Sequence, residues 1–159
     1  HVFMERLENA LSHRAGDDGS HVLAYLDLDH FKALNDAEGH RAGDQVLRDI
    51  SAILSQEVRK ADTLARLGGD EFGVLLEDCQ LLDGCSIAEN IRSRIERYEY
   101  VGARGIYRVE ASIGLVQLES RHGTPEDALH DTDSACYDAK RAGRNRVLVC
   151  AGATPVTEG

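Results

Sequence analysis

The sequence of 159 residues predicts an α/β (α+β) domain in which helices pack on a mixed central β-sheet. Residues 21–28 (HVLAYLDL) are apolar without clean alternation, which is typical of a central strand covered on both faces. Residues 63–76 contain two strand-like runs on either side of Gly68 and Gly69, which indicates a β-hairpin. Segments with apolar residues at three- and four-residue spacing separate the strands and predict covering helices.

The first half of the chain is predicted to hold this central strand and three helical segments. Its elements are a helix over 2–13, a polar loop over 14–20, the strand over 21–28, a helical turn over 31–36 and a helix over 44–58. The last of these helices carries its apolar residues, from Leu47 to Val58, on one face. Gly39 and His40 mark a break before it.

The second half is predicted to complete the sheet. Its elements are the hairpin over 63–76, a helix over 86–98, a strand over 107–115, a helix over 125–141 and a short strand over 146–150. In the strand over 107–115, apolar residues alternate with Arg108, Glu110 and Ser112, so we expect it to be half-buried. Pro125 and Gly143 are placed to start and stop the last helix. The element order is α-β-α-α-β-β-α-β-β-α-β, with one domain over 1–150 and a C-terminal linker over 151–159.

Composition narrows the class of function. The net charge of −10 argues against binding to a nucleic acid polymer. The four cysteines have no CxxC spacing, so a zinc site is not expected. We expect them to be reduced thiols in a cytoplasmic protein. No apolar run approaches the roughly 20 residues that cross a bilayer. Because the chain starts inside a helical pattern without Met, we expect it to belong to a larger protein, with further regulatory domains beyond it.

Two pairs of acids stand where strands are expected to end or turn. Asp27 and Asp29 lie where the central strand ends, and Asp70 and Glu71 follow the two glycines. Glycines there allow positive φ angles and leave room for a ligand, so a hard cation could be held, whereas the alternative is a solvated turn. An EF-hand is excluded, because its loop would need an oxygen ligand and a glycine where residues 31 and 32 are Phe and Lys.

Six short motifs run through nearly the whole chain. They are DLDHFKALND (27–36), GHRAGD (39–44), RKAD (59–62), RLGGDEF (66–72), ASIG (111–114) and AKRAGRN (139–145). With these motifs in this order, the chain resembles the GGDEF domain of diguanylate cyclases, bacterial enzymes that condense two molecules of GTP into cyclic di-GMP. The resemblance implies a palm-like nucleotidyl cyclase fold with the signature on a β-hairpin.

The resemblance also implies a metal site. Asp27, the Leu28 carbonyl and Asp70 would bind two Mg²⁺ (or Mn²⁺) ions for each GTP, since carboxylates facing a triphosphate need cations between them. Asp70 would also accept the proton of the attacking hydroxyl, and Glu71 would be a required acid beside it. The alternative for Asp27 is a cap on the turn that follows the strand.

The substrate contacts implied by the resemblance fall into two groups. Phosphates would meet the side chains of Lys32, Lys140 and Arg144, with Lys32 also counted among the catalytic residues. Backbone N–H groups near His30 and Phe31 would donate to the phosphates, with the Phe31 ring in the core, and Gly68 and Gly69 would leave room for the substrate. Guanine would meet Asn35 and Asp44, with His40 as a further nucleotide contact. A carboxylate can accept from two adjacent donors of guanine, which adenine lacks. The alternatives are a helix N-cap for Asp44, and complementing a helix dipole for Lys140 and Arg144.

Arg59 and Asp62 form the RxxD pattern of the family's inhibitory site, where they would grip a guanine of cyclic di-GMP. The isolated pattern is more often a solvated surface pair. The family often adds an arginine from a later helix, and this chain has Asn90 there, in the stretch AENIR.

By resemblance, two domains would face each other as a transient homodimer so that two GTP molecules can react. The main alternative is a GGDEF domain that only binds GTP or cyclic di-GMP as a regulatory module, joined to a sensor or to a phosphodiesterase (EAL) domain. A second alternative is a cyclase acting on one nucleotide. In each case we expect a cytoplasmic domain of a larger bacterial protein, which can itself be membrane-anchored.

Overall fold

The structure, a computed structural model, describes residues 2–14 and 19–150. The expected linker over 151–159 lies outside these residues. The elements are α1 (Val2–Arg14), β1 (Val22–Asp29), α2 (Phe31–Glu38), α3 (His40–Glu57), β2 (Thr63–Arg66), β3 (Glu71–Leu76), α4 (Leu81–Arg97), β4 (Glu99–Val101), β5 (Ile106–Arg108), β6 (Glu110–Gln117), α5 (Pro125–Arg141) and β7 (Arg146–Val149). The predicted α/β class with a mixed sheet is confirmed.

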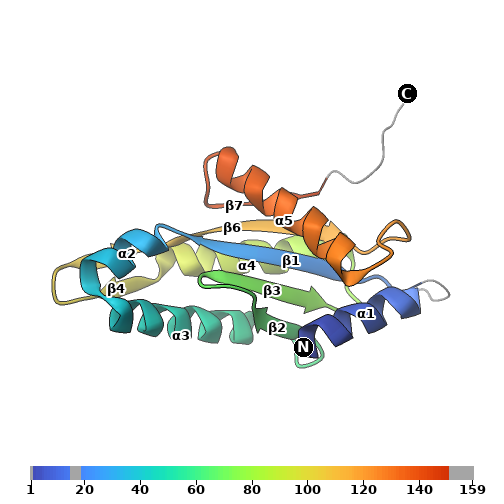
Figure 1. Cartoon of the computed structure of the whole chain (residues 1–159), viewed down its shortest axis with the longest axis horizontal. Coiled ribbons are helices and arrows are strands. Elements are labelled where there is room, and N and C mark those ends of the chain that lie inside the picture. The colour runs from blue at the N-terminus through green and yellow to red at the C-terminus, as the bar shows by residue number, and fades with distance from the viewer. Residues whose placement is uncertain (1, 15–18, 151–159) are drawn as a thin grey trace.

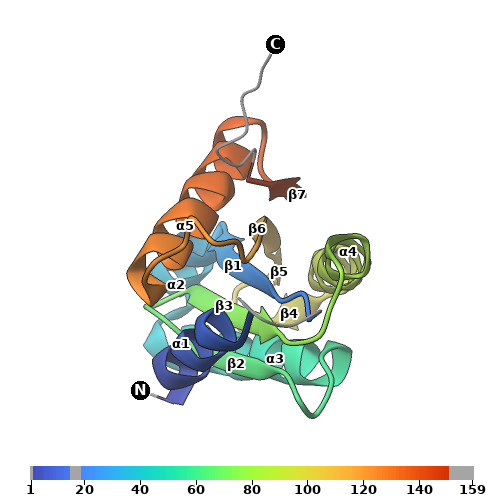
Figure 2. The same ribbon diagram turned by 90° about the vertical axis from the view of Figure 1, so that its right-hand side faces the viewer.

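The main sheet has the strand order β2-β3-β1-β6-β7. β1 lies at its centre and pairs antiparallel with β3 and with β6, whereas β7 runs parallel to β6. Figure 2 shows α4 on one side of this sheet and α1 and α5 on the other. The strands β4 and β5 form a separate ribbon close to α2, at one end of the molecule (Figure 1).

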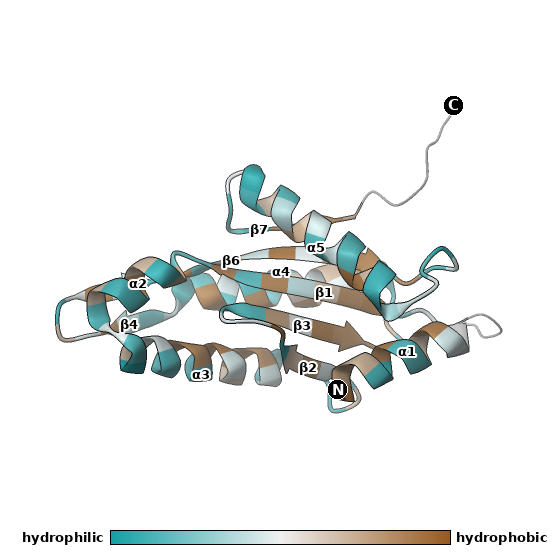
Figure 3. Cartoon of the chain, viewed as in Figure 1, coloured by the Kyte–Doolittle hydropathy of each residue, from teal (hydrophilic) through white to brown (hydrophobic). Residues whose placement is uncertain are grey.

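Two cores hold these layers together. The larger lies between the sheet and the helices α3 and α4, and the smaller lies between the sheet and the helices α1 and α5. Strand residues therefore alternate between two apolar layers, and in Figure 3 most of the strand length is brown to white while the helices carry teal residues. The prediction that β1 is covered on both faces is confirmed.

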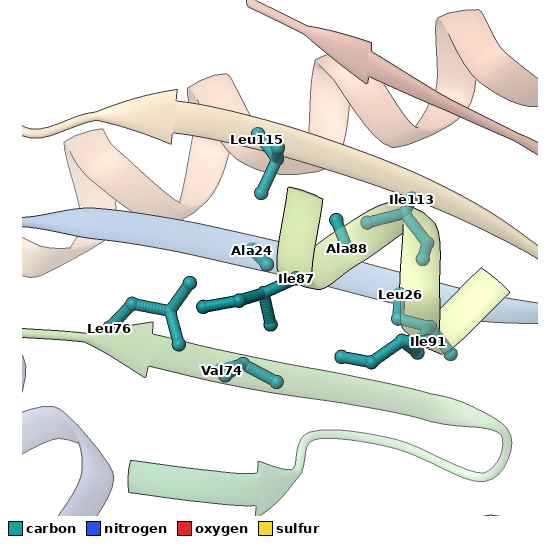
Figure 4. A pocket seen from close by; sticks show the side chains of 9 residues that line it. All are labelled: Ala24, Leu26, Val74, Leu76, Ile87, Ala88, Ile91, Ile113 and Leu115. Atoms are coloured by element: carbon teal, nitrogen blue, oxygen red, sulfur yellow. The ribbon is translucent and has the colours of Figure 1, made fainter. Parts of the chain in front are cut away.

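The larger core is nearly filled. Nine apolar side chains of β1, β3, β6 and α4 line a small space in it (Figure 4). Its volume is about 10 Å³, close to that of one water-sized sphere. This space is a packing gap and carries no argument for a ligand.

The N-terminal helix contacts the hairpin that bears the signature. Phe3 of α1 and Leu67, just after β2, both lie against Gly73 of β3. A Cβ atom on Gly73 would stand 2.9 Å from the nearest carbon of each. A larger residue at Gly73 would therefore displace the ends of these two side chains.

Several expected bounds differ from the structure. α3 begins at His40 rather than residue 44, because its first turn starts with the polar His40 and Arg41 and lacks the apolar spacing that signals a helix. α4 begins at Leu81 rather than residue 86; its first turn contains Gly84, and its Leu82 is exposed, so the turn has no regular apolar face. The expected strand over 107–115 is divided between β5 and β6, and β4 adds one strand to the predicted order. The expectation that this strand is half-buried holds over 107–110, where Arg108 is exposed and Val109 is buried. It is wrong from residue 111 on: Ser112 is fully buried, because α4 covers one face of β6 and α5 covers the other.

We expect Gly114→Ala to destabilise the protein by about 3 kcal/mol, because overpacking of a closed contact forces the backbone to move. A Cβ atom at Gly114 would lie less than 3.0 Å from backbone atoms of Thr132, Ala135 and Cys136 in α5. Urea unfolding measures the change. Gly123→Ala is the matched control, since its nearest new contact is 3.6 Å away. Equal stability of the two variants would contradict the packing argument.

Candidate functional site

An acidic cluster lies where β1 ends and β3 begins. The antiparallel register places Asp27 opposite Glu71, and the Leu28 N–H donates to the Asp70 carbonyl at 3.1 Å. One carboxylate oxygen from each of Asp27, Asp70 and Glu71 lies within 4.8 Å of the others. The structure therefore brings Asp27 and Asp70 as close together as a shared cation requires.

The cluster has an excess of negative charge that a divalent cation would relieve. Burial, and next the charge of Asp70, raise the pKa of Asp27 to about 6, although Lys140 opposes the change. The Tyr25 hydroxyl donates to Glu71 at 2.9 Å, and burial and this carboxylate raise the pKa of the phenol. Clustered carboxylate oxygens are the ligands that Mg²⁺ and Mn²⁺ prefer, so the residues fit such an ion.

Lys140 lies beside Asp27 of the cluster, and both Lys140 and Arg144 lie near Asp29, which the sequence analysis paired with Asp27 but to which the resemblance assigned no role. Lys140 Nζ is 3.5 Å from Asp27 Oδ2 and 3.1 Å from Asp29 Oδ1, and Arg144 Nε is 3.8 Å from Asp29 Oδ1. Although burial acts in the opposite direction, the bond to Asp29 and the charge of Asp27 raise the pKa of Lys140. The sequence analysis noted Asp29 at the end of the central strand but did not predict that Lys140 and Arg144 would lie beside it.

The substrate contacts predicted on α2 follow directly after β1 in the chain, and no contact between their side chains and the acidic cluster is found among the described residues. Lys32 is 86% exposed and pairs with Asp36 at 3.0 Å, so its ammonium is accessible to an anion. Asn35 Nδ2 lies 3.4 Å from His40 Nδ1, and Phe31 packs on the larger core as expected. Asn35 rests on Gly43 of α3, where a Cβ atom would come within 3.0 Å of its side chain. Gly43 thus makes room for Asn35.

Asp44 is exposed on α3, inside the helix. Its alternative role as an N-cap is wrong, because the helix begins four residues earlier and Gly39 occupies the cap. Asp44 lines two adjoining grooves with Arg48, and Arg66 lines the larger one. That groove has a volume of about 560 Å³, which gives a planar base ample room.

The hairpin tip is held by Arg66, which the sequence analysis did not single out. Its Nε donates to the carbonyls of Gly68 and Gly69, each at 3.0 Å. Neither glycine uses the positive φ angle that its type allows. A Cβ atom on Gly68 would lie 2.8 Å from Glu71 Oε1, so a larger residue there would displace the end of that side chain; none of the neighbours described for Gly69 comes within 4 Å of such an atom.

Arg59 and Asp62 form a two-bonded pair away from the acidic cluster. Arg59 donates to the two carboxylate oxygens of Asp62 at 2.9 and 3.1 Å, and this bond raises the pKa of Arg59. The Asp62 carboxylate is fully buried and also accepts the backbone N–H groups of Arg59 and Glu77. Half of the Arg59 side chain stays exposed. Asp62 therefore holds the loop, and Arg59 offers the accessible surface.

Arg92, which lies in the same stretch as Asn90, pairs with residues other than Arg59 and Asp62. Its guanidinium pairs with Glu89 at 2.6 Å and with Glu96 at 3.2 Å, and it donates to the Asn145 side chain at 2.8 Å. It is 15% exposed. Arg92 thus ties α4 to the turn before β7.

Comparisons with known proteins show which family the chain is similar to. Residues 1–146 match the family described as "Diguanylate cyclase, GGDEF domain". The chain is 41% identical over 129 residues to the probable diguanylate cyclase DgcE of Escherichia coli, covering 81% of this chain and 12% of DgcE. It is 39% identical over 141 residues to MucR of Pseudomonas aeruginosa, a bifunctional diguanylate cyclase and cyclic di-GMP phosphodiesterase, covering 89% of this chain and 20% of MucR. The chain thus spans a fifth or less of these two relatives.

The fold is similar to that of a solved GGDEF domain. The crystal structure of the GGDEF domain of DgcB from Caulobacter crescentus in complex with c-di-GMP superimposes with a TM-score of 0.87 at 27% identity. The match covers 94% of this chain and 88% of that domain. In the described part of the chain, no helix is both long and apolar enough to cross a membrane.

We expect Asp27→Asn to stabilise the metal-free protein by about 2 kcal/mol at neutral pH. The pKa of Asp27 rises from 3.8 to about 6 on folding, so the ionised carboxylate opposes folding above pH 6 and the protonated one does not below about pH 4. The gain should therefore fall to zero as the pH drops between these values. Urea unfolding in EDTA at several pH values measures it. The exposed Asp138→Asn is the control, and a gain in Asp27→Asn that is independent of pH would contradict the argument.

Proposed function

The chain belongs to the diguanylate cyclase GGDEF domain family, and on this premise we propose that it condenses two molecules of GTP into cyclic di-GMP and two pyrophosphates. The observation that carries the proposal is the cluster of Asp27, Asp70 and Glu71 beside Lys140 and Arg144. Acidic metal ligands and phosphate-binding cations meeting at one strand end form the constellation that nucleotidyl transfer needs.

Asp27, Asp70 and the Leu28 carbonyl would hold two Mg²⁺ (or Mn²⁺) ions, with Glu71 beside them. Bound ions of this kind make a hydroxyl oxygen more nucleophilic and offset the charge of the phosphates. Asp70 would accept the proton of the attacking 3′-hydroxyl. A bond forms between that oxygen and the α-phosphorus of the second GTP, and the bond to the β-phosphate breaks with its electron pair on the departing pyrophosphate.

The other site residues bind and orient GTP. Lys32, Lys140 and Arg144 would contact the phosphates, and the backbone at His30, Gly68 and Gly69 would approach them closely. Asn35 and Asp44 would read the guanine edge, with His40 beside Asn35. The exposed position of Asp44 over a wide groove supports a base contact rather than a capping role.

The cyclic product needs two bound GTP molecules facing each other, so the active form would be a transient homodimer. Each domain would present its 3′-hydroxyl to the α-phosphate held by the other, and positioning would supply much of the rate. The encounter of two domains then limits turnover.

We predict that the purified chain converts GTP and Mg²⁺ to cyclic di-GMP slowly, and that fusion to a dimeric helix raises turnover per molecule at least tenfold at low protein concentration. Chromatography of the nucleotides measures the product. Asp70→Asn in the fusion should abolish it. If the fusion binds GTP but forms neither cyclic di-GMP nor its linear intermediate, the chain is instead a regulatory module; a cyclic mononucleotide would identify the alternative one-nucleotide cyclase.

Constant turnover per molecule over a wide dilution series of the unfused chain would overturn the dimer account. The fused and unfused proteins share every residue of the site, so they differ only in how often two domains meet.

Arg59 is proposed to bind cyclic di-GMP at the RxxD site, since half of its side chain is exposed while Asp62 orients it. We predict that Arg59→Ala raises the concentration of cyclic di-GMP needed for half inhibition by about tenfold or more, because a bidentate charged contact is lost. Enzyme assays with added product measure it, and Arg108→Ala, which removes an exposed arginine of β5, is the control. Asp62 is a poor test, because its loss would leave two backbone N–H groups unpaired. Unchanged inhibition in Arg59→Ala would remove Arg59 from this role.

A further inference from the structure

Asp29 is a buried carboxylate that the reaction proposed above does not use. Its side chain has no exposed surface at the end of β1. It accepts hydrogen bonds from the Ser112 hydroxyl at 2.8 and 3.0 Å, from Lys140 Nζ at 3.1 Å and from the Asn145 N–H at 3.2 Å. A buried carboxylate needs such donors to replace the water it has lost. Asp29 therefore ties β1 to β6, to the last turn of α5 and to the turn before β7.

The turn held by Asp29 has an unusual backbone. Gly143, Arg144 and Asn145 have φ angles of 127°, 64° and 49°. Left-handed conformations cost a non-glycine residue about 1 kcal/mol or more, so two in succession need compensating contacts. Asp29 accepts the Asn145 N–H on one side of the turn.

The turn is also held from α4. The Asn145 side chain accepts from Arg92 and donates to Glu96, each at 2.8 Å. The backbone that carries Arg144 is thus fixed between β1 and α4. The guanidinium of Arg144 lies 3.8 Å from the carboxylate of Asp29.

Lys140 is placed in the same way. A free lysine side chain has about 2 kcal/mol of rotamer entropy, which a phosphate contact would otherwise have to overcome. Here its ammonium already lies between Asp29 and Asp27, at 3.1 and 3.5 Å. An ammonium has three N–H groups, so one remains for a phosphate oxygen.

We propose that Asp29 is a positioning residue for the triphosphate of GTP, which holds Lys140 and the turn bearing Arg144 where the phosphates arrive. The inference rests on the proposed function, since it names how that site prepares its cations. The inference also predicts a change in triphosphate binding that is opposite in sign to the one that charge repulsion alone predicts. Removing one more negative charge near a triphosphate should strengthen binding by repulsion alone, whereas loss of positioning should weaken it.

The test measures binding of a non-hydrolysable GTP analogue with Mg²⁺ by calorimetry, and of guanosine by NMR titration. We expect Asp29→Asn to weaken binding of the analogue about tenfold and to leave guanosine binding within about twofold, because only the phosphate contacts are misplaced. In a Lys140→Met background, Asp29→Asn should reduce the affinity for the analogue by a clearly smaller factor, since one of the cations that Asp29 positions is already absent.

Three outcomes overturn the inference: stronger analogue binding in Asp29→Asn, equal weakening for analogue and guanosine, or the same loss with and without Lys140. If the unmutated protein fails to bind the analogue, the proposed function fails and the inference fails with it; the other outcomes leave the proposed function intact.

Ser112→Ala provides a milder variant if Asp29→Asn does not fold. It removes one donor to Asp29 and should weaken binding of the analogue by a smaller factor. Unchanged binding in this variant would count against the inference.

Asp131→Asn is the matched control for stability. Asp131 is likewise an ion-paired carboxylate, but it pairs with His122 and lies nine residues before Lys140 on α5. It should lower stability and leave analogue binding unchanged.

Discussion

The site depends on holding like charges together at one end of a sheet. Two carboxylates 4 Å apart repel by about 4 kcal/mol at an effective dielectric constant of 20. The register of β1 against β3 imposes this proximity on Asp27 and Glu71, and Asp70 follows from the tight hairpin. The two cores on either side of the sheet supply the free energy that keeps the register. The free energy of folding therefore offsets the repulsion between the carboxylates before a cation binds.

Elements with strong apolar patterns could be predicted from the sequence, and polar element starts could not. β1 and the β2–β3 hairpin lie where expected, because a doubly covered strand must be apolar throughout. The first turn of α3 begins with the polar His40 and Arg41, so only tertiary context reveals that it is helical. Ser112 misled for the opposite reason. Its hydroxyl is satisfied inside the protein by Asp29, and a pattern of side-chain polarity cannot register an internal partner.

The acidic residues of the site could be predicted from the sequence, whereas most of the residues that hold the site in place could not. Asp27 and Asp70 stand in motifs and meet as the motifs imply. Lys140 lies in the last turn of α5, as its helix-dipole alternative requires, and its ammonium also lies beside Asp27. Asp29, Arg66 and Asn145 act through contacts with residues far away in sequence or with backbone carbonyls, and no local spacing encodes such contacts.

The packing of Phe3 and Leu67 on Gly73 makes three distant positions interdependent. A bulkier residue at any one of them displaces a neighbour unless another becomes smaller. Among related sequences, these positions should therefore change in compensating sets, and a chimaera that takes α1 from one protein and the hairpin from another would inherit a mismatch at this seam.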